Sequence, residues 1–478
     1  MAKAKSVFVC TECGTQQPRW LGRCPGCGAW QSLVEEPVGP PPSGAAADLL
    51  ELVPPRTPDD SARPSPSLRA SLAGRAIPLR EVSADAAPRA ETGIAELDRV
   101  LGGGLVPGSV VLIGGEPGIG KSTLCLQLAL AIEGRGGRVL YVTGEESLEQ
   151  VRLRAERLGE LGDRVLALAE TRVEALAKPW RDARPTLVLI DSIQTLRTER
   201  VESAAGSVAQ VRECAALLAA TAKTHGTALV LVGHVTKEGT LAGPRVLEHL
   251  VDVVLSFEGE RGHPFRLLRA TKNRFGSTQE VGVFTMGEHG LDVVENPSEL
   301  FLAERHAGAP GSCIVPVLEG SRPMLLEVQA LVAPAGYGTA RRTCLGIDDG
   351  RVALLLAVLD RRSDVDLLSC DVYVNVAGGV RVAEPAADLA VAMALASSRL
   401  DLPLPADVAA CGEVGLGGEI RRVARLEDRL REAARLGYGR VLVPARATPL
   451  AATGAATPIG VDDVGEAVAW LRRNVHAV

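Results

Sequence analysis

The stretch GEPGIGKS, residues 115–122, has the residue types and spacing of a loop that binds phosphate groups. Its glycines let backbone N–H groups approach a phosphate at the start of the helix that follows. In this motif Lys121 reaches the β and γ phosphates, and the hydroxyl of Ser122 is a ligand of Mg²⁺. The sequence predicts an ATP site with Mg²⁺, formed by Gly115, Glu116, Pro117, Gly118, Ile119, Gly120, Lys121, Ser122 and Thr123.

Acidic residues follow two later apolar runs that are typical of strands. Asp191 ends the run TLVLIDS and is the candidate second ligand of Mg²⁺, although an aspartate there also suits a plain turn. Glu145 and Glu146 end the run YVTGEES, and hydrolysis of ATP needs a group that activates water. We expect Glu145 to be the general base because it comes first after the strand, with Glu146 as the alternative.

Cationic residues complete the set of candidate catalytic side chains. His234 ends the run LVLVGHV, where it is placed to sense the γ phosphate or to serve the structure alone. Lys272 and Arg274 lie two positions apart in TKNRFGS, just after a strand-like run. By themselves these two cations could meet DNA, a nucleotide or only water.

Four cysteines near the N-terminus form two CxxC pairs separated by ten residues: Cys10, Cys13, Cys24 and Cys27. Each pair turns two thiolates toward one point, and two pairs complete the tetrahedral shell that Zn²⁺ prefers. A pair of redox dithiols is the alternative. We expect a structural zinc site, because four protein ligands leave no open position for catalysis.

Composition and patterning divide the 478 residues into several parts. We expect a zinc module at 1–35, a proline-rich linker at 36–78, and an α/β domain at 79–296 whose apolar strands form a mostly parallel sheet. Residues 297–478 contain hairpin-like pairs and an alanine-rich helix, which indicate a second α/β domain. The N-terminus lacks a signal peptide and no long apolar run occurs, so we expect a cytoplasmic protein without a membrane contact. Aromatic residues are only 3%, so surfaces for stacking bases should be scarce.

The stretch 92–129, which contains the phosphate loop, resembles the RecA-like ATPases. With the cysteine pairs, the motif KNRFG and the C-terminal domain, the whole chain resembles the RadA/Sms family of bacterial recombination proteins. This resemblance implies a homo-hexameric, DNA-dependent ATPase that acts as a ring-shaped motor on single-stranded and branched DNA and promotes branch migration. It also implies a recombinase filament or a replicative helicase as a partner.

The resemblance assigns roles to further residues. It implies that Lys272 and Arg274 enter the nucleotide site of a neighbouring subunit, within the motif formed by Lys272, Asn273, Arg274, Phe275 and Gly276. A cation supplied in this way stabilises the charge on the transferred phosphoryl group. The segment 237–249 corresponds to the pore loop of RecA-like proteins, and its Lys237 and Arg245 are the candidate contacts to DNA phosphates.

Residues 371–478 resemble the proteolytic domain of Lon, which uses a serine and a lysine. The matching positions hold Ala386 and Glu427, so we expect no peptide cleavage. The arginine-rich helix at about 424–436 should help to close the ring and present Arg425, Arg429, Arg431 or Arg435 to duplex DNA, with partner contact as the alternative. Two rival functions remain: an ATP-controlled scaffold that binds DNA without moving along it, and a Lon-type protease.

Overall fold

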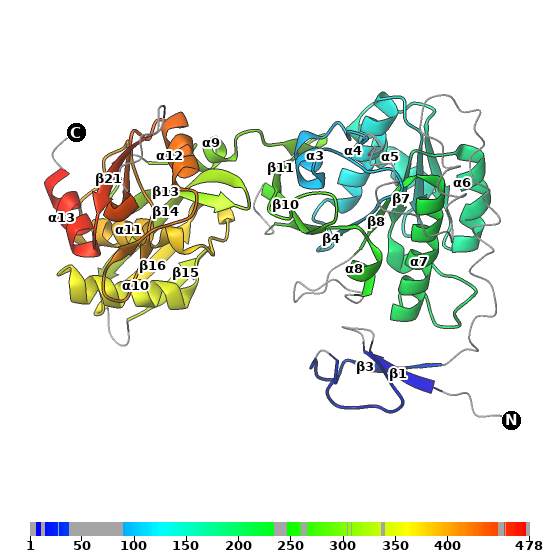
Figure 1. Ribbon diagram of the computed structural model, residues 1–478, viewed down its shortest axis with the longest axis horizontal. Helices are drawn as coiled ribbons and strands as arrows, with labels where there is room; N and C mark the ends of the chain where they lie inside the picture. The colour runs from blue at the N-terminus through cyan, green and yellow to red at the C-terminus, as the bar shows by residue number, and fades with distance from the viewer. Residues whose placement is uncertain are drawn as a thin grey trace, which may run out of the picture. The chain divides into compact units, whose positions relative to one another are not determined.

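A computed structural model shows the fold over residues 6–10, 15–26, 28–37, 89–233, 246–259, 265–303, 305–306, 308–335, 340–447, 454 and 456–474. The described residues from 89 to 293 belong to one compact unit and those from 294 to 474 to another (Figure 1). Within these ranges no helix is long and apolar enough to cross a membrane.

The N-terminal module is a small antiparallel sheet with the order β2-β1-β3. Its strands are β1 (Ser6–Cys10), β2 (Gln16–Gln17) and β3 (Leu33–Pro37). An isolated antiparallel bridge joins Arg23 to Trp30 between β2 and β3. Its small core contains Cys10, Cys24 and Leu33.

The first unit is built on a nine-stranded sheet with the order β12-β11-β10-β9-β4-β8-β7-β5-β6. The six strands from β9 to β6 in that order are parallel, whereas β10, β11 and β12 extend the sheet with antiparallel pairs. The strands are β4 (Val110–Gly115), β5 (Val139–Thr143), β6 (Val165–Ala169), β7 (Leu187–Asp191), β8 (Ala228–Val232), β9 (Val253–Glu258), β10 (Phe265–Asn273), β11 (Val281–Gly287) and β12 (Gly290–Val293).

Helices cover both faces of this sheet (Figure 1). One apolar core contains residues of α3 (Ala95–Leu101), α4 (Lys121–Gly134) and α5 (Leu148–Leu158). The core on the opposite face contains residues of η2 (Val173–Leu176), α6 (Ala177–Ala183), η3 (Ile193–Thr195), α7 (Val208–His225) and α8 (Val246–Leu250). Burial on both faces explains the continuous apolar runs of the central strands, so the predicted mostly parallel α/β core is confirmed.

The second unit contains a mixed seven-stranded sheet with the order β15-β16-β14-β13-β17-β20-β21 and a separate pair β18-β19. Its strands are β13 (Ser312–Glu319), β14 (Arg322–Pro334), β15 (Arg342–Leu345), β16 (Cys370–Val376), β17 (Val408–Ala410), β18 (Glu413–Val414), β19 (Ile420–Arg421), β20 (Arg440–Pro444) and β21 (Thr457–Val461). Its helical segments are α9 (Pro297–Leu302), α10 (Asp349–Arg362), η4 (Ala377–Gly379), η5 (Pro385–Ala387), α11 (Asp388–Leu400), α12 (Leu426–Arg435), η6 (Ala445–Ala447) and α13 (Val464–Asn474). The unit is thus a second α/β domain, as predicted, and β13 and β14 form the predicted hairpin.

Candidate nucleotide site and signature motif

The predicted phosphate loop connects β4 to α4. Gly120 precedes the helix with a φ of 115°, a left-handed conformation that glycine adopts without strain. Gly115 ends β4, and a Cβ atom there would lie 2.6 Å from the carbonyl oxygen of Phe257. The loop therefore needs glycine at both positions, and it leaves the free N–H groups at the start of a 14-residue helix available to an anion.

The side chain of Lys121 lies against the phosphate loop. Its Nζ donates hydrogen bonds to the carbonyl oxygens of Gly115, at 2.7 Å, and Glu116, at 2.8 Å. Burial lowers the pKa of Lys121, while the nearby Asp191 and Glu145 act in the opposite direction. The ammonium group thus lies beside the loop where a phosphate would dock, with both predicted acidic residues close enough to affect it.

Asp191 ends β7 and is paired in register with Thr143 at the end of β5. The hydroxyl of Tyr141 donates a hydrogen bond of 2.7 Å to Oδ2 of Asp191. Burial and the charge of Asp191 raise the pKa of this buried phenol, so it remains a proton donor at neutral pH. Tyr141 fixes one oxygen of the carboxylate, and the donor set of Ser122 and Asp191 suits Mg²⁺, which prefers oxygen ligands.

The two adjacent glutamates have different partners. The hydroxyl of Ser192 donates a hydrogen bond of 2.6 Å to Oε1 of Glu145. The carboxylate of Glu146 instead forms an ion pair with Arg154, and its backbone N–H donates to Oγ1 of Thr143 at 3.1 Å. The charge of Glu145 also acts to raise the pKa of Lys121. The geometry favours Glu145 as the general base, and the roles of Tyr141 and Ser192 were not anticipated from the sequence.

Three predicted residues, His234, Lys237 and Arg245, lie outside the described residues. Their assigned roles at the γ phosphate and on DNA therefore stay predictions.

The two cations of the motif KNRFG are held by the residues that lead into β9. Lys272 donates from Nζ to the carbonyl oxygens of Glu248, at 2.5 Å, and Val251, at 2.8 Å. Burial and the charge of Arg274 lower the pKa of Lys272. Arg274 lies 3.1 Å from Oδ1 of the buried Asp252 and is 54% exposed. Arg274 therefore remains accessible from solvent while Asp252 orients it.

The other residues of the motif fix this position. The Asn273 side chain donates to the carbonyl oxygen of Val100 at 3.1 Å and accepts from the backbone N–H of Phe275 at 2.9 Å. Arg89 donates to the carbonyl oxygen of Phe275 at 2.6 Å. At Gly276 a Cβ atom would lie 3.4 Å from Cα of Gly102. The contacts of Asn273 and the close packing at Gly276 thus fasten the two cations to the end of α3.

The motif and the chain's own phosphate loop lie toward opposite ends of the neighbouring strands β10, β9 and β4. Gly115 pairs in register with Phe257, whereas Lys272 pairs with Val254 at the start of β9. Oδ2 of Asp252 also accepts a hydrogen bond of 3.1 Å from the N–H of Val110, the first residue of β4. The backbone N–H of Arg274 donates to the carbonyl oxygen of Asp252, so Arg274 is level with Val110, roughly 16 Å along β4 from Gly115 at about 3.3 Å per residue. Lys272 is level with Leu112, roughly 10 Å along the strand from Gly115.

Two of the predicted zinc ligands, Cys10 and Cys24, lie in the core of the N-terminal module. The N–H of Gly26 donates to Sγ of Cys24 at 3.3 Å, and Sγ of Cys10 donates to Oγ of Ser32 at 3.2 Å. A backbone donor such as that of Gly26 stabilises a thiolate, which suits Cys24 to a metal site. Cys13 and Cys27 lie outside the described residues, and the four-cysteine site stays a prediction.

The positions that match the serine and lysine of Lon have unrelated surroundings. Ala386 is 4% exposed in η5 and has no hydroxyl group. Glu427 is 59% exposed and lies 3.3 Å from Arg431. Neither residue forms part of a nucleophile and base pair.

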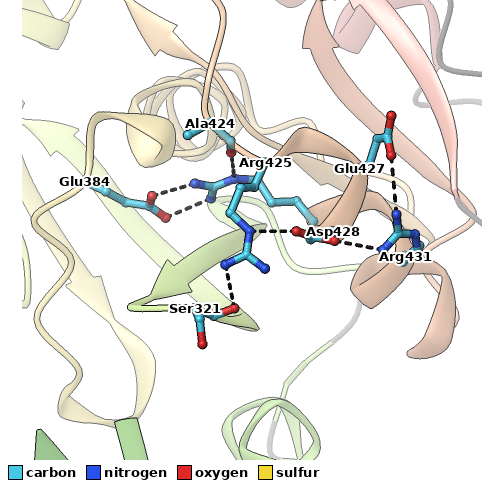
Figure 2. A network of polar contacts seen from close by, with 8 residues as sticks. Ser321, Glu384, Ala424, Arg425, Glu427, Asp428 and Arg431 are labelled. Carbon is cyan, nitrogen blue, oxygen red and sulfur yellow. Dashed lines mark hydrogen bonds and ion pairs between the residues drawn. The ribbon is translucent and has the colours of Figure 1, made fainter. Parts of the chain in front are cut away.

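The arginines of α12 and its N-cap are matched by carboxylates, and Figure 2 shows those around Arg425 and Arg431. Arg425 lies 2.7 Å from Asp428 and Arg431 lies 2.8 Å from the same carboxylate. Arg435 lies 2.8 Å from Glu432. This arrangement neutralises most of the positive charge that the sequence suggested for DNA contact.

Arg429 is buried, which corrects the prediction that it contacts DNA. Its side chain is 1% exposed, and its two Nη atoms donate to both carboxylate oxygens of Glu384 at 2.8 and 2.6 Å. It also donates to the carbonyl oxygens of Ala424, at 3.0 Å, and Pro316, at 2.6 Å. All of its donor groups are therefore directed into the domain, where DNA cannot reach them.

Comparison with protein families divides the chain in three. Residues 8–35 match a rubredoxin metal binding domain, residues 75–240 match an AAA domain, and residues 361–451 match the Lon protease C-terminal proteolytic domain. The chain is 49% identical over 468 residues to the DNA repair protein RadA of Bacillus subtilis, covering 98% of this chain and 97% of that one. Its identity to the protein of the same name is 50% in Halalkalibacterium halodurans and 49% in Listeria monocytogenes, in each case over 93% of both chains.

Proposed function

Because the chain belongs to the RadA family of DNA repair proteins, we propose that it is a DNA-dependent ATPase that works as a homo-hexameric ring. On this proposal it moves on single strands within branched DNA and promotes branch migration during homologous recombination and repair. A recombinase filament or a replicative helicase is the expected partner on that DNA.

The separation of the signature motif from the chain's own phosphate loop carries this proposal. Arg274 lies near the start of β9, at the end of the central strands away from the loop, and the ammonium of Lys272 is bound to carbonyl oxygens that precede β9. Both cations are therefore directed away from the phosphate loop of their own subunit. The exposed guanidinium of Arg274 is placed to enter a site on a second copy. A complete site would then need residues from two subunits, which supports a ring.

Within one subunit, Lys121 and the N-terminus of α4 bind the phosphates. Ser122 and Asp191 would hold Mg²⁺, which neutralises phosphate charge when bound. Glu145 accepts a proton from the attacking water, with Ser192 holding its carboxylate. Lys272 and Arg274 of a neighbour stabilise the charge on the transferred phosphoryl group, an effect worth roughly 10³ to 10⁵ in rate for such arginines.

A mixing experiment tests the shared site. Lys121→Ala subunits lack a working phosphate loop, and Arg274→Ala subunits lack the cation for a neighbour. Each variant alone should hydrolyse little ATP, and mixed assemblies should recover part of the activity. Arg152→Ala, which alters an exposed arginine of α5 that is paired with Glu156, is the matched control and should behave as wild type. No recovery at any mixing ratio, with mixed assembly verified, would contradict the proposal.

Movement along DNA is tested separately from hydrolysis. We expect ATPase activity and strand displacement to be stimulated together on forked DNA and less on flush duplex. Stimulated hydrolysis without displacement would instead indicate a scaffold that ATP controls.

We further propose that the Lon-like domain does not cleave peptides. Ala386 cannot act as a nucleophile, and the exposed Glu427 cannot act as the lysine base. The proposal would be contradicted if the purified chain cleaved an unfolded protein substrate and a serine-directed inhibitor abolished that cleavage.

A further inference from the structure

Two tryptophans lie on the surface of the N-terminal module. The side chain of Trp20 is 54% exposed and that of Trp30 is 73% exposed. The chain has only four tryptophans, and Trp180 shows the usual alternative, since it is 2% exposed within the first unit. The core of the module is formed by other residues, so neither exposed ring is there to fill it.

Both rings lie close to one glycine. Cη2 of Trp20 and Cζ3 of Trp30 are each 3.8 Å from the point that a Cβ atom on Gly22 would occupy. Glycine at this position leaves room for both rings. The bridge between Arg23 and Trp30 holds the second ring, and the N–H of Gln31 donates to the carbonyl oxygen of Gly22 at 2.8 Å. Trp30 thus lies on paired backbone next to Gly22.

Positive charge accompanies the rings. The guanidinium carbon of Arg23 lies 5.9 Å from the centre of the Trp30 ring, and Nε of the same residue donates to the carbonyl oxygen of Gly28 at 2.9 Å. Arg19 is exposed and adjacent to Trp20 in sequence. Residues 1–37 contain four cations and three acids, a net charge of +1, and two of the acids, Glu35 and Glu36, lie on β3.

We propose that Trp20, Trp30, Arg19 and Arg23 form a binding site for single-stranded nucleic acid. Bases would stack on the two rings, and the guanidinium groups would contact phosphates. Unpaired bases offer both of their faces, whereas a duplex keeps its bases stacked internally, so the site should prefer single strands. A protein partner would be favoured by a wider apolar surface, but among the described residues of the module only Val34 is another exposed large apolar side chain. This inference rests on the proposed action on DNA and assigns a separate contact for it.

Tryptophan fluorescence of the full-length chain, titrated with oligo-dT, tests the site directly. We expect quenching, and we expect Trp20→Ala or Trp30→Ala to weaken binding by about fivefold or more, the scale of one lost stacking contact. Trp→Phe at either position should retain most of the affinity. Val34→Ala changes an equally exposed residue of the same module and should leave the affinity unchanged. Zinc content equal to that of wild type verifies that each variant is folded.

The salt dependence of binding tests the arginines. Each phosphate contact to a single strand contributes about 0.7 to the slope of log affinity against log salt. Arg19→Ala and Arg23→Ala should therefore each lower this slope by about that amount.

Different outcomes separate this inference from the proposed function. Titrations without nucleotide, and in a Lys121→Ala chain, should give the same quenching, because the site does not need the ATPase. If wild type binds no DNA at all, both proposals fail. If wild type binds DNA and DNA stimulates its ATPase, but the alanine variants bind oligo-dT as tightly as wild type, only this inference fails. Variants that keep this affinity but lose a protein partner would also overturn it.

Discussion

Glu145 and Glu146 are neighbours in sequence with opposite surroundings, and the difference predicts their roles. Glu145→Gln should abolish ATP hydrolysis while ATP binding persists, whereas Glu146→Gln should retain much of the activity. Ser192→Ala should lower kcat about tenfold, because a hydrogen bond to a charged group contributes about 1.5 to 3 kcal/mol. Steady-state kinetics with all three variants checks this. Equal losses at Glu145 and Glu146 would contradict the assignment.

Tyr141 predicts a dependence of stability on alkaline pH. Its folded-state pKa is raised, so the folded chain keeps the phenolic proton while an unfolded chain loses it near pH 10. The stability from this group is complete below about pH 10 and falls as the pH rises further. Above that pH, the free energy of unfolding should fall more steeply with pH for wild type than for Tyr141→Phe. The two slopes should differ by about 1.4 kcal/mol per pH unit. Urea unfolding from pH 9 to 11 measures this, and parallel curves would contradict it.

The sequence could predict Lys121, Asp191 and the glutamate pair because a short motif and strand ends locate them. Tyr141 and Ser192 carry no such signal. Tyr141 looks like one more apolar residue of β5, and its contact with Asp191 exists only because β5 and β7 are neighbours in the sheet. The contact between Ser192 and Glu145 likewise joins residues that are 47 positions apart.

Helix α12 shows how an element can look basic in sequence and carry little net charge in the structure. Glu427, Asp428 and Glu432 lie three or four positions from Arg431 and Arg435, a spacing that forms ion pairs on a helix. These pairs could have been found from the sequence. The burial of Arg429 could not, because Glu384 lies 45 positions away.

The same helix gives a stability prediction. Arg429→Ala should destabilise the second unit by about 3 to 5 kcal/mol, because it removes one partner of a buried pair. Arg431→Ala should cost less than about 1 kcal/mol, because its pairs are exposed. Chemical denaturation of the two variants measures the contrast. Similar losses of stability in the two variants would show that the buried pair contributes no more to stability than the exposed pairs.

At the scale of the whole chain, the metal predicts independent behaviour of the N-terminal module. Cys24→Ser should remove the bound zinc, one ion per chain in wild type, and unfold the module, since a fragment of that size depends on metal to fold. The thermal transition of the ATPase unit should not change, because the sequence predicts a linker between them. Elemental analysis and calorimetry check both results. A loss of the ATPase transition would show that the module supports that unit.

Much of the architecture could be predicted because apolar runs such as those of β7 and β8 are buried on both faces and bounded by helices. The antiparallel extension formed by β10, β11 and β12 was not predicted. In β10 only Leu268 and Ala270 are buried, and β11 and β12 are buried at their starts and exposed toward their ends, so neither a continuous apolar run nor a regular alternation marks them as strands. The sequence also did not predict that Trp20 and Trp30 are exposed near each other. The low content of aromatic residues does not show where in the fold those residues lie.

Arg274 and the phosphate loop lie at opposite ends of the central strands, so the two neighbours of a subunit in the proposed assembly would contact different surfaces of it. Each subunit would contact one neighbour through the surface that carries Arg274 and the other neighbour through the surface that carries the phosphate loop. Such a heterologous contact forms a closed assembly only as a ring. A closed cycle has as many complete sites as subunits, while an open row always lacks one. Activity per subunit should therefore rise with protein concentration until cycles form and then become constant. One opened contact would disable one site and leave the others intact, so a cycle could open to admit DNA while most of its sites remain complete.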